Sequence, residues 1–122
     1  MMIRGIRGAT TIPADTAEFV WAETAFLVVE MAKENKIVPE DIASITISTT
    51  ADIKSAFPAK AVRSMDGWQY VPIMCTHEMD VPGGLPLCIR VLMHVNTEAA
   101  QQDIHHVYLH DAVKLRPDLV RK

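Results

Sequence analysis

The sequence has few cysteines and no long hydrophobic run free of charge. Cys75 and Cys88 are its two cysteines, too few to predict a disulfide framework, and a reducing cytoplasm fits best. The most apolar stretch, residues 25–32, contains Glu30 and precedes Lys33, so it is too short and too charged to span a bilayer. No uninterrupted apolar core follows the first basic residue, and no signal peptide is expected.

The chain also lacks a basic excess and the common cofactor motifs. Lys and Arg number 12 against 15 Asp and Glu, for a formal net charge of -3, which argues against a nucleic-acid surface but not against a small basic pocket. GxGxxG, P-loop and GxSxG patterns are missing, which leaves nucleotide binding and serine hydrolysis without a signal. HExxH and CxxC are missing too. The sequence therefore predicts neither a cofactor nor a metal.

What is present is the pattern of one α+β domain of 122 residues, with helices on one face of a mixed sheet. A capping box from Asp15 to Glu18 predicts a helix start at Asp15, and Pro72 inside a strand predicts an edge or a bulge. We expect residues 111–122 to form a mobile C-terminal tail. The expected strands span residues 2–9, 42–49, 69–76, 88–96 and 107–110, and the expected helices span 15–35 and 59–65.

Several Arg and Lys side chains are candidates for binding an anionic ligand. Arg90 lies in the middle of an apolar strand, and Arg7 precedes Gly8, which permits close backbone approach. Lys60 and Arg63, three residues apart, share one face of the second helix. For each cation, ordinary placement on a solvent-facing surface is the alternative. Without a nucleophile or cofactor motif, the arginines favour an anion held by charge and hydrogen bonds.

Two carboxylates, Glu78 and Asp80, follow His77. A paired-carboxylate mechanism is possible in principle, and a metal held with His77 is conceivable. Neither has a supporting motif.

Eight blocks spread over the whole chain stand out as an ordered set. They are MMIRGIRGATT at residues 1–11, FPAKAVR at 57–63, GWQYVP at 67–72, EMDV at 78–81, GGL at 83–85, CIRV at 88–91, HVYL at 106–109 and LRPDL at 115–119. Several ordered blocks are more specific than one short motif, and together they resemble the small trimeric chorismate mutase family of the Bacillus type, the AroH class.

The resemblance implies a trimeric pseudo-α/β-barrel with three active sites between adjacent subunits, acting on chorismate to give prephenate without a cofactor. It implies that Arg90 contacts the ether oxygen and a carboxylate of the substrate. Arg7 and Tyr108 would hold the side-chain carboxylate, while Glu78 and the backbone at Cys75 would hold the ring hydroxyl.

The resemblance also implies a wall and an entrance. Phe57, Ala59 and Ile73 would line the site, and Met74 departs from the smaller polar residue expected beside Cys75. The tail is shorter than expected, which bears on how it covers the site. The residues that would shape the entrance and its mobile cover are Lys60, Arg63, Leu115 and Arg116.

These residue types suit the Claisen rearrangement, a unimolecular step that needs positioning and a fixed cation rather than proton transfer. Two other hypotheses stay open at this point. One is a trimeric imine or enamine deaminase that holds a carboxylate with an interfacial arginine, and the other is a non-catalytic binder of aromatic-pathway metabolites.

Overall fold

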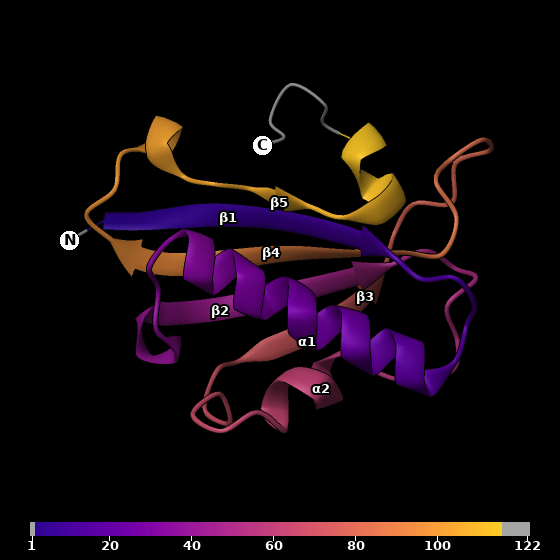
Figure 1. The fold of residues 1–122 in the computed structure, drawn as a ribbon, viewed down its shortest axis with the longest axis horizontal. Helices are drawn as coiled ribbons and strands as arrows, with labels where there is room; N and C mark the ends of the chain where they lie inside the picture. The colour runs from indigo at the N-terminus through magenta and orange to yellow at the C-terminus, as the bar shows by residue number, and fades with distance from the viewer. Residues whose placement is uncertain (1, 116–122) are drawn as a thin grey trace.

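The structure is a computed structural model that describes residues 2–115. Five strands form one mixed sheet, α1 (Ala17–Glu34) lies across one face of it, and α2 (Ala59–Arg63) lies beside α1 near the β3 edge (Figure 1). The strands are β1 (Met2–Thr11), β2 (Ile42–Thr49), β3 (Ile73–His77), β4 (Cys88–Thr97) and β5 (Val107–Tyr108), and the short 3-10 helices are η1 (Pro39–Asp41), η2 (Gln101–Asp103) and η3 (His110–Lys114).

The strand order in the sheet is β3-β2-β4-β1-β5. β4 runs antiparallel to both of its neighbours, whereas β1 with β5 and β2 with β3 are parallel pairs. The carboxyl ends of four strands and the start of β4 therefore meet at one end of the sheet (Figure 1). The predicted α+β class and mixed sheet are confirmed; assembly into a trimeric barrel stays a prediction. No described helix is both long and apolar enough to cross a membrane.

The face of the sheet under α1 is apolar and closely packed. Its buried side chains alternate along the strands, as the pleat requires. At Gly8, an added Cβ would lie 2.4 Å from the Met31 sulfur, so the missing side chain lets α1 approach β1. A register shift between Ile42 and Ser44 brings both Ile42 and Ile45 to this face. The core under α1 includes Ile6, Leu27, Val28, Met31, Ile45, Ile47, Val91 and Met93.

The start of α1 differs from the prediction. Thr16, not Asp15, is the N-cap residue, and its hydroxyl accepts a hydrogen bond from the Phe19 amide. The Asp15 carboxylate instead accepts hydrogen bonds from the amides of Lys54 and Ser55, at 2.9 and 3.1 Å. The Ser55 hydroxyl and these amides lower the pKa of Asp15. Asp15 therefore fastens the loop before α2 to the start of α1.

Two strands are shorter than predicted. β3 begins at Ile73, directly after Pro72, and it is an edge strand, which is where a proline is tolerated. β5 ends at Tyr108. Beyond it, residues predicted as tail form η3, in which Ala112 is fully buried. The mobility of the tail stays a prediction.

Candidate active site

Arg90 lies on the face of the sheet opposite α1, which we call the open face. On that face, Ser48 pairs with Arg90, and Thr76 is the next residue outward on β3. On the other side of Arg90, Ala9 and then Tyr108 continue the same row across β1 and β5. Register partners point to the same side of a sheet. The fold therefore sets the Arg90 guanidinium in one polar row with Thr76, Ser48 and Tyr108.

The Arg90 side chain is paired on one side only. Its Nη1 lies 3.3 Å from Glu78 Oε2, and both side chains are about 30% exposed. Glu78 is held in place because its amide donates to the Thr49 carbonyl at 2.8 Å and its Oε1 accepts from the Met79 amide. Glu78 thus pairs with a cation rather than with the exposed Asp80, which does not support a paired-carboxylate mechanism. The Nε of Arg90 is buried and has no hydrogen-bond partner among the described residues.

Tyr108 carries the second buried group of the open face that lacks a hydrogen-bond partner. Its ring is packed into a small buried cluster, yet its buried hydroxyl has no partner within the part of the chain that the structure describes. Buried polar groups nearly always have a hydrogen-bond partner, so two unpartnered groups in one row indicate that a ligand supplies the missing partner.

Burial raises the pKa of the Cys88 thiol, although the neighbouring Arg90 opposes that shift. The Tyr108 cluster consists of Ala9, Cys88 and Ala112, with Leu85 and Leu115 packed against it.

Arg7 belongs to the next row of the open face. It pairs with Leu92, so it lies diagonal to Arg90, at a typical separation of about 7–8 Å between backbones. Its amide donates to Nδ1 of His106 at 2.9 Å, which fixes β1 against the chain leading into β5. Two guanidinium groups and one carboxylate on one half-buried surface give a site suited to an anion.

Phe57 and α2 form a second group. Phe57 is 75% exposed, and its carbonyl accepts a hydrogen bond from Trp21 Nε1 at 3.2 Å. The Lys60 ammonium lies 4.7 Å from the centre of the Trp21 ring, Arg63 is exposed, and Ala59 is almost fully buried. α1 therefore holds this group through Trp21.

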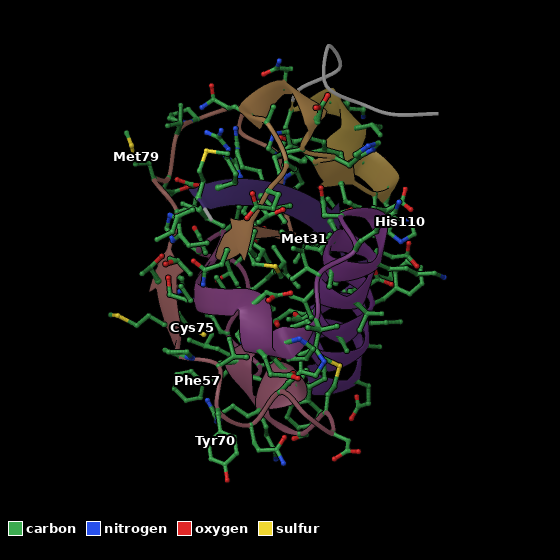
Figure 2. The ribbon with its side chains drawn as sticks, turned by 90° about the vertical axis from the view of Figure 1, so that its left-hand side faces the viewer. Met31, Phe57, Tyr70, Cys75, Met79 and His110 are labelled. Carbon is green, nitrogen blue, oxygen red and sulfur yellow. The ribbon has the colours of Figure 1, made fainter. Side chains whose placement is uncertain are left out.

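β3 supplies the remaining predicted residues. Cys75 and Phe57 line a hollow of about 540 Å³ beside the loop before α2. Ile73 pairs with Ile45 and packs against the core, whereas Met74 is 70% exposed on the open face. Figure 2 shows Phe57, Cys75 and Met79 on the side of the molecule away from α1.

The structure thus gathers the predicted residues into two groups. Arg90, Glu78, Arg7 and Tyr108 come together at one end of the open face, and Leu115 packs behind Tyr108. Phe57 and Cys75 line the hollow, and the exposed cations Lys60 and Arg63 follow on α2. No hydrogen bond or ion pair between described residues joins the two groups. Arg116 lies outside the described residues.

Sequence reasoning missed several residues that position these groups. Asp15 and Trp21 fasten the Phe57 loop to α1, and no local pattern signals either contact. Ser48 and Thr76 extend the Arg90 row. Ser44, Thr46 and Ser48 lie on one face of β2, but only the pairing of Ser48 with Arg90 shows that Arg90 shares that face. No three His, Cys, Asp or Glu side chains between residues 2 and 115 are placed to hold a metal ion.

The chain is similar to chorismate mutases throughout its length. The family model "Chorismate mutase type I" matches residues 3–119. The protein "Chorismate mutase AroH" of Bacillus subtilis is 54% identical over 119 residues, covering 98% of this chain and 94% of that protein. The protein of the same name from Thermus thermophilus is 45% identical, covering 97% of each. The solved structure of a chorismate mutase from Clostridium thermocellum has a TM-score of 0.86 at 51% identity, covering 88% of this chain and 96% of that one.

Proposed function

The chain belongs to the chorismate mutase type I family and is an isomerase of that type, and from this premise we propose how its residues act. The substrate is chorismate, a dianion, and the product is prephenate. The observation that carries the proposal is a pair of buried polar atoms without hydrogen-bond partners among residues 2–115, Arg90 Nε and Tyr108 OH. They lie in one row of the open face, which also carries Arg7. Two carboxylates on one small molecule explain why cations converge in a chain of net negative charge.

In this proposal, the first group of residues binds and orients. Arg7 and the Tyr108 hydroxyl hold the side-chain carboxylate, and Arg90 reaches the ether oxygen together with a carboxylate, which its planar fork allows. Glu78 of the first group and the backbone at Cys75 of the second group hold the ring hydroxyl. These contacts keep the substrate in the compact shape from which the reacting carbons meet.

Arg90 also makes the main electrostatic contribution to the rate of the rearrangement. The rearrangement breaks one C–O bond and forms one C–C bond without proton transfer. As the C–O bond stretches, negative charge grows on the enolpyruvyl oxygen and positive charge grows on the ring. A fixed guanidinium at that oxygen therefore stabilises the transition state more than the substrate. Glu78, held near Arg90, has the sign that favours the ring charge.

We propose further that two copies of the chain complete each site in a homotrimeric barrel. Support comes from the two groups of residues, which no hydrogen bond or ion pair among residues 2–115 joins, and from the exposed part of the open face away from η3. That face exposes large apolar side chains, with Ile3 61%, Met74 70% and Leu92 38% exposed, as expected for a surface that another copy covers. The second copy would bring Phe57, Ala59, Ile73 and Met74 as walls and Lys60 and Arg63 at the entrance, while Leu115 and Arg116 of the first copy would help to cover it.

The direct test is incubation of the purified protein with chorismate, following the loss of its ring-diene absorbance. Turnover with formation of prephenate is expected, and the Arg90→Ala variant serves as the matched control. Binding without turnover would favour a non-catalytic metabolite binder. Activity on 2-aminoacrylate-type imines in its place would favour the deaminase alternative. Neither the family model nor the two relatives bear such a name.

Assembly and location need separate measurements. Sedimentation equilibrium should give three times the chain mass of 13.6 kDa, and a fully active monomer would contradict the shared site. A cytoplasmic location is supported by the two cysteines, both of which are free.

A further inference from the structure

Glu23 joins three elements outside the proposed site. It lies in the middle of α1, and its Oε1 accepts a hydrogen bond from the Thr10 hydroxyl at 2.9 Å. The same oxygen lies 3.2 Å from Nε2 of His110, the first residue of η3. Figure 2 shows His110 beside α1, on the side of the molecule opposite Phe57. One carboxylate oxygen thus connects the end of β1, the middle of α1 and the start of η3.

The contact holds a turn that the backbone does not adopt easily. His110 has a φ of 54°, in the left-handed region that non-glycine residues rarely occupy. This conformation turns the chain from β5 into η3. Neighbouring hydrogen bonds fix the same corner, since the Leu109 amide donates to the Ala9 carbonyl at 2.9 Å and the Asp111 amide donates to Thr11 Oγ1 at 3.3 Å. Glu23 ties this corner to α1.

The corner determines where part of the site lies. Tyr108 stands two residues before His110, and Ala112 and Leu115 of the following segment pack against the Tyr108 cluster. Displacing η3 would loosen the packing that keeps the Tyr108 hydroxyl in the Arg90 row. Glu23 itself is on the helix-covered side of the sheet with Thr10, so it does not reach the open face.

We propose that Glu23 is a positioning residue for substrate capture, which acts through His110 to hold η3 and Tyr108 against the binding face. This inference rests on the proposed function, because it concerns the same site. Glu23 and His110 touch neither the ether oxygen nor the reacting carbons. The contact between Glu23 and His110 therefore affects how well the substrate is bound more than how fast it reacts.

The first test uses single variants and a matched control. Glu23→Ala and His110→Ala should each raise KM for chorismate by about three- to tenfold and change kcat by less than about twofold. Combining the two should be no worse than the larger single effect, since both break one interaction. The control is Glu30→Ala, seven residues along the same side of α1, because the Glu30 side chain makes no hydrogen bond or ion pair with another described residue. Glu30→Ala should leave KM unchanged.

The second test exchanges the charges. Glu23→Lys alone should raise KM at least as much as Glu23→Ala. Glu23→Lys together with His110→Glu restores an ion pair of opposite direction, and KM should return to within about twofold of the parent value. Rescue of this kind would not follow if the two side chains merely added general stability.

A third readout does not depend on activity. Amide hydrogen exchange in residues 109–115 should accelerate by about three- to tenfold in Glu23→Ala but not in Glu30→Ala, while exchange in β2 and β4 stays unchanged. Unchanged exchange and KM in Glu23→Ala, an equal effect of Glu30→Ala, or a kcat loss as large as the KM change would overturn the proposal. If the parent chain itself fails to turn over chorismate, the proposed function is wrong. The hydrogen-exchange data still decide whether Glu23 holds η3 in place.

Discussion

The two faces of the sheet are built from the same strands and differ in how much surface they leave exposed. Under α1, most side chains are apolar and buried, although the buried Thr24 hydroxyl has no hydrogen-bond partner within residues 2–115, and at Gly8 not even a methyl group has room. On the open face, Arg90 Nε and Tyr108 OH lack partners within residues 2–115, and Ile3, Leu92 and Met74 are exposed. In the proposed function, a bound substrate and a second copy of the chain would complete the open face.

The largest expected effect comes from Arg90, the centre of the open face. Arg90→Ala should lower kcat by about 10²–10³, roughly 2.7–4 kcal/mol, because it removes a donor that acts on charge formed only in the transition state. Arg90→Lys keeps the charge but not the fork, so it should recover little turnover and part of the binding. The test is to measure kcat and KM by steady-state kinetics, on variants whose circular dichroism and sedimentation match those of the parent protein. A well-folded Arg90→Ala enzyme with near-normal kcat and only a raised KM would refute the electrostatic role.

A pair of glycines on β1 tests the difference in packing. Gly8→Ala places a methyl group against Met31, and since that side chain must shift, a cost of about 1–3 kcal/mol is expected. Gly5→Ala meets only Leu92, at an ordinary 3.5 Å on the open face, and should change the free energy of unfolding by less than about 0.5 kcal/mol. Chemical denaturation measures both. Equal losses from the two substitutions would show that the faces are not packed differently.

Removing the end of the chain should have a smaller effect. Deletion of residues 113–122 takes away Leu115, which packs behind Tyr108, but leaves the sheet and α1 intact. KM should rise by about three- to tenfold with a smaller change in kcat, since the segment helps to capture and cover the dianion without touching the breaking bond. If kcat fell as far as in Arg90→Ala, the tail would have to be part of the chemistry.

Removal of metal ions should have no effect on turnover, the smallest effect expected here. Exhaustive dialysis against a metal chelator should leave turnover unchanged, because the proposed mechanism uses only groups of the protein itself. The assay compares dialysed and undialysed enzyme at equal concentration. Loss of activity that added metal restores would show that the open face binds more than the substrate.

The sequence predicted the fold well where the signal was local. The Ile and Val alternation located β2 and β4, and the long apolar helix was correctly placed within two residues at its start. That error arose because Asp15 bonds to Lys54 and Ser55, a contact between distant residues. Pro72 correctly indicated an edge strand, since its missing N–H has no place in a central ladder.

The candidate site was less predictable because it depends on strand order. Arg90 and Glu78 were singled out from the sequence, but β3 and β4 are not neighbours, and Glu78 reaches Arg90 past β2. No local pattern reveals that arrangement. The left-handed turn at His110 and its contact with Glu23 are likewise set by how η3 packs, not by any motif near them.

The measurement that tests the shared site most directly mixes two damaged chains. Arg90→Ala chains lack the cation of the first group, and Lys60→Glu/Arg63→Glu chains carry repelling charges in the second group. Each protein alone should be nearly inactive at low chorismate concentration. If each site joins residues of two copies, co-expression and random assembly should restore about a quarter of the sites to parent composition, and activity should rise to about that fraction. Activity no greater than the sum of the two variants measured separately would contradict the account.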